Sequence, residues 1–132
     1  MPNVNLKANR PLSPHLQVYK LILTMLMSIL HRITGAALYF GTILMVMWLI
    51  AAASGPEYYA FVSDLFGSFF GRLILFGFTW ALVHHMLGGF RHFIWDLGKG
   101  FEPEARNWMA KATIIGSVSI TILLWIVGYM VR

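Results

Sequence analysis

Cysteine is absent from this sequence and acidic residues are scarce. Without a single cysteine among the 132 residues, neither a disulfide framework nor a thiolate metal site is available. Only 5 residues are Asp or Glu, and residues of both charges make up 11% of the chain, whereas 58% of it is hydrophobic. Because a soluble domain usually carries about 25% charged residues, the composition indicates a membrane protein.

Three segments contain no Asp, Glu, Lys or Arg over a length close to that of a membrane span: residues 33–55, 73–90 and 112–131. A spanning helix needs about 20 mostly apolar residues, and the first two segments continue helically beyond their uncharged cores. We therefore predict an all-α integral membrane protein with one domain, residues 1–132. Its three spanning helices are expected at roughly residues 24–54, 64–95 and 107–131.

Turn-forming residues indicate where these helices end. The run Ser54-Gly55-Pro56 is expected to stop the first helix, because proline cannot continue the backbone hydrogen bonds and glycine suits a C-terminal cap. We expect Asp64 near the start of the second helix. Residues 96–100, with two glycines, should end it, and residues 102–107 should form a polar bridge to the third.

Positive charges are distributed unevenly along the chain. Most lie before the first span or between the second and the third: Lys7, Arg10, Lys20, Lys99, Arg106 and Lys111. The connection over residues 51–62 contains neither Lys nor Arg. The positive-inside rule therefore places the N-terminal segment, residues 1–20, on the cytoplasmic or matrix side. This asymmetry explains the net charge of +5 without nucleic-acid binding.

The beginning of the chain does not resemble a targeting segment. Lys20 and Arg32 interrupt its apolar region, unlike a signal peptide, and an Arg- and Ser-rich transit segment is missing. We expect a multi-pass protein of the bacterial inner membrane, or of the mitochondrial inner membrane if the chain is made in the organelle or already processed.

The most informative stretch is His85 to His92. Two helical turns take about 7.2 residues, so these two imidazoles lie on nearly one face, about 10 Å apart along the axis. Gly88 and Gly89 remove side-chain bulk close to that face. Because imidazole at membrane depth is costly and usually functional, the pattern predicts a site for a large, flat ligand.

His84 adjoins His85 and is a second candidate, about 100° away around the helix. We expect it to face another helix or lipid as a packing residue. His92 has two open interpretations. It can act as a cation that favours the helix C-terminus, or as a polar contact for the ligand.

A second polar group interrupts the first span. Ser28 and Arg32 are four residues apart and share a helix face, with His31 beside them. Either Arg32 extends to the membrane interface while His31 caps local polar groups, or the three together bind a carbonyl or carboxylate. The second helix brings further polar residues to the same side of the membrane: His85, Arg91, His92 and Asp96.

Together the two motifs resemble the larger cytochrome b membrane anchor of succinate dehydrogenase, respiratory complex II. The resemblance rests on Ser-Ile-Leu-His-Arg-Ile-Thr-Gly at residues 28–35 and on His-Met-Leu-Gly-Gly-Phe-Arg-His-Phe-Ile-Trp-Asp at residues 85–96. Arg-Pro-Leu-Ser-Pro-His-Leu at residues 10–16 is similar to the mitochondrial and alphaproteobacterial branch. The likeness covers nearly the whole chain, including the order of spans and motifs.

The resemblance implies a haem-binding bundle formed with a smaller anchor subunit. His85 would be one axial ligand of a haem b iron, and the other axial histidine would come from the smaller anchor. His31 and Arg32 would lie near the haem propionates. His92 lies too far along the helix to ligate the same iron and would at most contact the propionate edge.

The resemblance also implies that Ser28 and Arg32 help to form a ubiquinone pocket, and that Asp96 lies on a possible proton route near quinone and haem. Further partners would be a flavoprotein subunit with FAD, an iron–sulfur subunit with its clusters, and membrane lipid. His15 is expected to contact a soluble partner. No catalytic residue, and no activity of this chain alone, is expected.

Two alternatives remain open from the sequence. A fumarate reductase anchor would share the architecture and run the reaction with a low-potential quinol. A small membrane transporter or assembly protein without haem belongs to a different class. That second alternative leaves His85, the glycines and Arg32 without a shared purpose.

Overall fold

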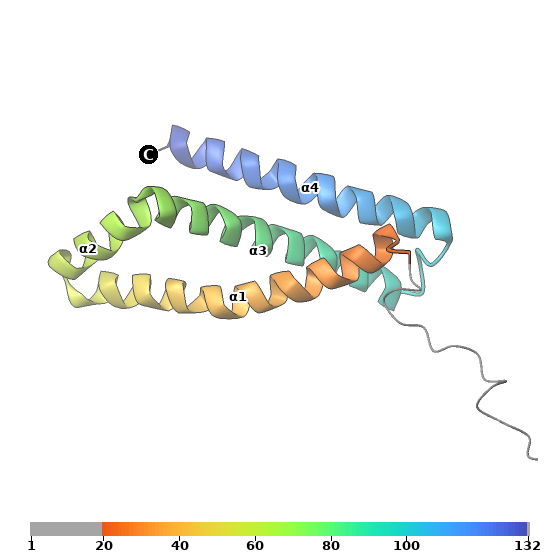
Figure 1. The fold of residues 1–132 in the computed structure, drawn as a ribbon, viewed down its shortest axis with the longest axis horizontal. Helices are drawn as coiled ribbons and strands as arrows, with labels where there is room; N and C mark the ends of the chain where they lie inside the picture. Colours follow the sequence, from red (N-terminus) through yellow and green to blue (C-terminus); the bar gives the residue numbers. More distant parts are fainter. Residues whose placement is uncertain (1–19, 132) are drawn as a thin grey trace, which may run out of the picture.

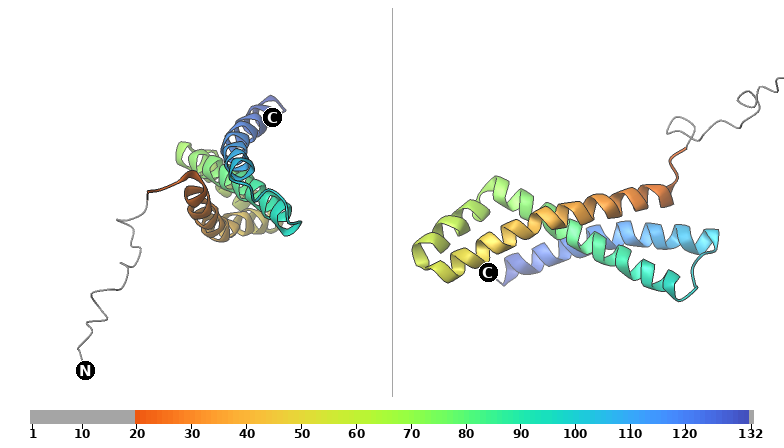
Figure 2. Two further views of the ribbon diagram at one scale, coloured as in Figure 1. Left: turned by 90° about the vertical axis from the view of Figure 1, so that its right-hand side faces the viewer. Right: turned by 90° about the horizontal axis from the view of Figure 1, so that it is seen from below.

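The structure is a computed structural model, which describes residues 20–131. This part of the chain forms helices α1 (Leu23–Ser54), α2 (Pro56–Gly67), α3 (Phe69–Asp96) and α4 (Pro103–Met130). The long helices α1, α3 and α4 run lengthwise, and the short α2 joins α1 to α3 at one end (Figure 1). Helix α3 packs against both α1 and α4, and it crosses α1 at an angle (Figure 2). The expectations for His15 and for residues 1–19 lie outside the described residues.

The three long helices confirm the predicted number of spanning helices. Helices α1, α3 and α4 contain 32, 28 and 28 residues and are apolar enough to cross a membrane. At 1.5 Å per residue each exceeds the roughly 30 Å of a hydrocarbon core. Large apolar side chains such as Phe40, Phe70 and Ile115 are exposed on the outside of the bundle, as expected of surfaces that face lipid or other membrane helices.

Small or hydroxylated residues make up most of the buried positions of α1 and α4, with Met27 as the exception. The buried residues of α4 recur every three or four positions: Ala110, Thr113, Ser117 and Thr121. Those of α1 are Met27, Thr34, Gly41 and Ala51. Apolar surface gains little from helix association inside a bilayer, so small side chains that allow close backbone approach dominate such interfaces.

The first span ends where the sequence predicts. Helix α1 stops at Ser54, because Gly55 adopts φ +120° and Pro56 occupies the first turn of α2. Proline suits that position because the first N–H groups of a helix have no partner within it. At the other end of the bundle, α3 stops at Asp96, and Gly98 and Gly100 take positive φ values in the connection.

The predicted start of the second span, near residue 64, is wrong. Asp64 lies inside α2, and α3 begins only after Ser68, which leaves the helical conformation at φ −64° and ψ 163°. The Ser68 hydroxyl caps α3 by accepting the Gly71 N–H at 3.1 Å. A side chain at position 71 would collide with the backbone of Leu65 and Phe66, so glycine lets the two helices meet at this corner.

The predicted polar bridge at residues 102–107 is also mostly helix. Helix α4 begins at Pro103, because this proline occupies its first turn just as Pro56 does in α2. Glu104 lies in the same turn, where the helix dipole favours a negative charge. The connection between α3 and α4 is therefore shorter than the sequence indicated, and it holds their ends together.

Candidate functional site

Three predicted site residues meet where α1 and α3 pack together. The rings of His31 and His85 stack with their centroids 3.9 Å apart and an angle of 3° between their planes. The ring of His92 lies 5.4 Å from that of His31 and is tilted by 43°. His31 therefore stands between the two histidines of α3, and the three form one imidazole cluster.

Two glycines make this close packing possible. A Cβ atom at Gly35 would lie 3.0 Å from Cε1 of His85, and one at Gly88 would overlap the ring of His31. A Cβ at Gly89 would meet nothing within 4 Å. The sequence predicts a bare helix surface at both glycines. This prediction is wrong for Gly88, because the imidazole of His31 fills the space beside it, whereas the space beside Gly89 is open.

The hydrogen bonds of His85 define its tautomer. Its Nδ1 lies 3.1 Å from the His31 carbonyl oxygen and 3.3 Å from Oγ1 of Thr34. The hydroxyl proton of Thr34 is directed to backbone carbonyl oxygens, 2.9 Å from that of Leu30 and 3.0 Å from that of His31. Both neighbours of Nδ1 are therefore acceptors, so Nδ1–H donates and Nε2 keeps the lone pair that binds a metal.

His84 lies in a different environment on the other face of α3. Its side chain is 1% exposed, its Nδ1 lies 3.1 Å from Oγ of Ser117 on α4, and its ring packs beside Trp80. Its Nε2 is buried without a partner. This confirms the expectation that His84 faces another helix, although one of its two nitrogens is unsatisfied.

The remaining predicted residues do not join the imidazole cluster. Ser28 and Arg32 are exposed on α1, so of this motif only His31 turns toward α3. Asp96 is exposed at the end of α3, and within residues 20–131 it forms no ion pair with Arg91 or His92. The Arg91 guanidinium instead lies over the ring of Trp95, 5.1 Å from its centroid.

Thr34 and Gly35 belong to the site but were not predicted as site residues. Thr34 is 1% exposed and supplies an acceptor to His85, and Gly35 leaves room for the His85 ring. The signal that could have found Thr34 is its position three residues after His31, on the same helix face. Because its hydroxyl lies about one turn further along α1 than the His31 imidazole, the position indicates a polar contact.

The chemistry of these side chains fits a haem held by one imidazole from this chain. Among residues 20–131 no three His, Cys, Asp or Glu side chains are grouped as a metal ion would require. His85 and His84 both have an oxygen acceptor at Nδ1, the usual arrangement of a metal-binding histidine, but of the two only His84 has its Nε2 buried without a partner. His84 does not fit, because its free nitrogen is sealed between α3 and α4.

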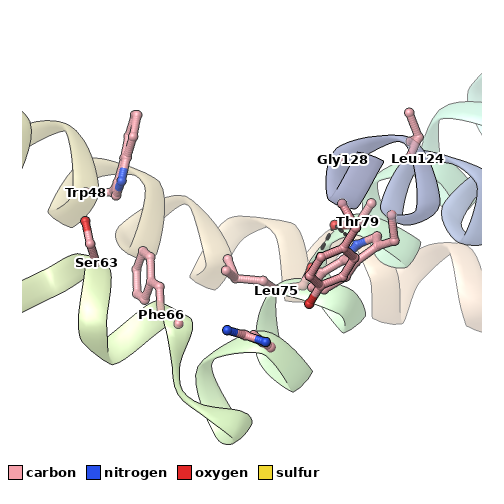
Figure 3. Close-up of a pocket in the computed structure, with 11 residues that line it drawn as sticks. Trp48, Ser63, Phe66, Leu75, Thr79, Leu124 and Gly128 are labelled. Atoms are coloured by element: carbon pink, nitrogen blue, oxygen red, sulfur yellow. Dashed lines mark hydrogen bonds between the residues drawn. The ribbon is translucent and has the colours of Figure 1, made fainter. Parts of the chain in front are cut away.

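A separate cavity of about 490 Å³ lies at the opposite end of the bundle, near α2 (Figure 3). Trp48, Phe66, Leu75 and Leu124 are among the residues that line it. The indole of Trp125 donates to Oγ1 of Thr79 at 3.2 Å beside it. The cavity contains none of the site residues predicted from the sequence.

Known proteins resemble this chain over about three quarters of its length or nearly all of it. The succinate dehydrogenase cytochrome b556 subunit of Paracoccus denitrificans is 45% identical over 130 residues, covering 98% of this chain and 99% of that protein. The corresponding subunit of Rickettsia felis is 36% identical, covering 89% and 91%. The mitochondrial cytochrome b560 subunit of Sus scrofa is 42% identical over 74% of this chain and 59% of its own length.

Residues 7–126 match the family described as the succinate dehydrogenase/fumarate reductase transmembrane subunit. That match includes the imidazole cluster, the Ser28–Arg32 segment and nearly all of the three spans. The resemblance, which at first rested on two short motifs, therefore extends over nearly the whole chain. The chain belongs to the succinate dehydrogenase/fumarate reductase transmembrane subunit family.

Proposed function

We propose that this chain is the larger membrane anchor of a succinate:ubiquinone oxidoreductase, complex II, and that it binds haem b and ubiquinone. In this proposal a flavoprotein subunit with FAD oxidises succinate, an iron–sulfur subunit carries the electrons to the membrane, and the anchor receives them. The names of the relatives, succinate dehydrogenase cytochrome b subunits, support it. Protein side chains supply binding, orientation and electrostatics, and the cofactors carry the electrons.

The observation that carries the proposal is the orientation of His85. Its Nδ1–H is held by the His31 carbonyl and the Thr34 hydroxyl oxygen, which leaves Nε2 free to bind iron. These acceptors also raise the basicity of the ring and fix its direction. When bound, haem b supplies a one-electron carrier within the membrane.

A second histidine for the haem would come from the smaller anchor subunit. His84 is sealed in the α3–α4 interface, and His31 and His92 lie beside His85 on the same side of α3. Because none of these three residues is suited to the role, a histidine of the smaller anchor subunit would hold the haem together with His85. His31, Arg32 and His92 would then serve the propionate carboxylates through charge-assisted hydrogen bonds.

Ser28 and Arg32 are the residues proposed for the quinone. Both are exposed on α1, where they can meet the iron–sulfur subunit and a quinone headgroup together. A hydroxyl and a guanidinium directed at a quinone carbonyl stabilise the negative charge that develops as it is reduced. Reduction to the quinol takes two electrons and two protons, and Asp96 is the proposed carboxylate on the proton route.

Arg32→Ala in the assembled complex tests the quinone assignment. We expect severe loss of ubiquinone reduction, while succinate oxidation by an artificial acceptor that bypasses the membrane stays near the wild-type rate. Arg72→Ala is the matched control, because Arg72 is an exposed arginine at the other membrane face. Unchanged quinone turnover in the Arg32 variant would refute the assignment.

The direction of electron flow and the localisation are also part of the proposal. The relatives are named for succinate dehydrogenase, which favours succinate oxidation over a fumarate reductase anchor. The proposed location is an inner membrane, with the α3–α4 connection on the cytoplasmic or matrix side. A visible spectrum tests the haem, since a colourless complex that retains its partner subunits would contradict this function and support a transporter or assembly protein.

A further inference from the structure

Arg91 is the only buried Lys, Arg, Asp or Glu among residues 20–131. Its side chain is 6% exposed, and its Nε has no hydrogen-bond partner. The ring of Trp95, 5.1 Å from the guanidinium carbon, provides a cation–π contact. Such a contact only partly offsets the cost of removing a charge from water, and buried charges in proteins normally have an anion beside them.

No carboxylate side chain of this chain provides that anion. The chain has 5 acidic residues, all exposed: Glu57, Asp64, Asp96, Glu102 and Glu104. None of them forms an ion pair with Arg91 in the described range, and residues 1–19 and 132 contain no Asp or Glu. A counter-ion for Arg91 therefore has to come from outside the chain.

Arg91 faces a different helix from the imidazole cluster, although Trp95 contacts both its guanidinium and the ring of His92. Arg91 follows His84 by seven residues, so both side chains lie on the face of α3 that packs against α4, and not on the face that carries His85 and His92. The proposed haem propionates lie on that other face. In that arrangement the propionates are not the counter-ion of Arg91.

An apolar groove of about 190 Å³ opens beside Arg91, between α3 and α4. Its walls include Leu87, Phe90, Ile94, Met109 and Thr113. Arg91 is five residues from the end of α3, about 7.5 Å along the axis, which places it near the boundary between hydrocarbon and headgroups. Trp108 lines the same groove, and tryptophan is typical of that boundary.

We propose that Arg91 and this groove bind one anionic phospholipid, with the phosphate on the guanidinium and an acyl chain between α3 and α4. A guanidinium matches phosphate geometry with two parallel hydrogen bonds. Lys99, Arg106 and Lys111 are exposed at the same end of the bundle and add positive charge. Basic pockets between membrane helices on the positive side typically bind anionic headgroups. The inference rests on the proposed function in one respect, since it takes the haem propionates to lie on the other face of α3.

Lipid binding to the purified, assembled complex tests this proposal. Phosphatidylglycerol, phosphatidylcholine or inorganic phosphate is added to delipidated complex, and retention is counted by native mass spectrometry alongside the shift in melting temperature. We expect selective retention and stabilisation by phosphatidylglycerol. Arg91→Gln should weaken phosphatidylglycerol binding about tenfold, as the loss of one charge-assisted hydrogen-bonded contact predicts. Arg72→Gln, the same change at the other end of α3, should leave it unchanged.

A second variant keeps the test decisive if Arg91→Gln does not assemble. Ala112→Phe fills the groove and preserves Arg91, so it should also reduce phosphatidylglycerol retention. Wild-type retention in either variant would overturn the proposal. Equal binding of phosphatidylcholine, stabilisation by inorganic phosphate alone, or no lipid effect on the wild-type complex would overturn it as well. The last result would instead point to a carboxylate of a partner subunit beside Arg91.

Discussion

The two faces of α3 carry similar residues with different surroundings. The face toward α1 holds His85 and His92, and the face toward α4 holds His84 and Arg91. Both histidines have an oxygen acceptor at Nδ1, but His84 is 1% exposed and its Nε2 is buried without a partner. Two imidazoles adjacent in sequence thus differ in whether a nitrogen can reach a ligand. The neighbouring helix, and not the residue type, makes the difference.

Replacing each of the two histidines by phenylalanine should give the largest difference between the two faces of α3. His85→Phe keeps the ring volume but removes the nitrogen proposed to bind iron, so the assembled complex should lose its b-type haem absorption. His84→Phe should keep most of that absorption. Reduced-minus-oxidised visible spectra of both purified complexes measure the outcome. If His84→Phe lost the haem and His85→Phe kept it, the assignment of the two faces would be reversed.

Two glycines of α3 provide a second matched pair. Gly88→Ala places a methyl group in the ring of His31, while a methyl group at Gly77, outside the motif, meets nothing within 4 Å. Overpacking of this kind costs about 1–3 kcal/mol, so Gly88→Ala should lower haem affinity about tenfold or more. Gly77→Ala should bind haem normally. Haem titration of the assembled variants separates them, and equal affinities would show that the His31 packing is unimportant.

A change on the α4 face should alter stability without altering the haem. Ser117→Ala removes the hydrogen-bond partner of His84 Nδ1 and should cost about 1 kcal/mol, a fall of a few degrees in melting temperature. Ser119→Ala, at an exposed position of the same helix, serves as the control and should stay within about 0.5 kcal/mol. A haem spectrum changed by Ser117→Ala would mean that the faces are not independent.

The smallest effect is expected from Thr34→Val. This variant removes one acceptor from Nδ1 of His85 and leaves the His31 carbonyl in place. A less basic imidazole stabilises the oxidised iron less, so the haem potential should rise by about 20–60 mV. Thr42→Val removes an exposed hydroxyl bonded only within α1 and should leave the potential unchanged. Redox titration compares the two, and a lower potential would contradict the tautomer assigned to His85.

The sequence predicts the spans well because membrane insertion depends on composition. A run of about 20 apolar residues without charge is long enough to cross a membrane. Inside lipid its backbone polar groups have to be satisfied within the segment, as a helix does. The end of α1 was also predictable, since Gly55 and Pro56 act locally on the backbone. The break at Ser68 was missed because its capping contacts with Leu65 and Gly71 form only when the chain turns there.

The candidate site was predicted only in part. Periodicity placed His85 and His92 on one face, and the structure has them on one side of α3, next to His31. Periodicity did not show that His31 turns away from Ser28 and Arg32 to fill the space above Gly88. That arrangement depends on how α1 crosses α3. The sequence of one helix taken alone does not determine this crossing. The haem and quinone roles of these residues stay predictions.

By itself the sequence determined the membrane class, the three spanning helices and the residues available for chemistry, because hydropathy and helical periodicity are local properties. Only the tertiary structure decided which face of α3 meets which helix. That pairing directs the Nδ1 proton of His85 to α1, buries His84 against α4 and leaves Arg91 without a counter-ion of its own. Hydrogen-bond partners and burial come from packing, and packing involves residues more than thirty positions apart in the chain.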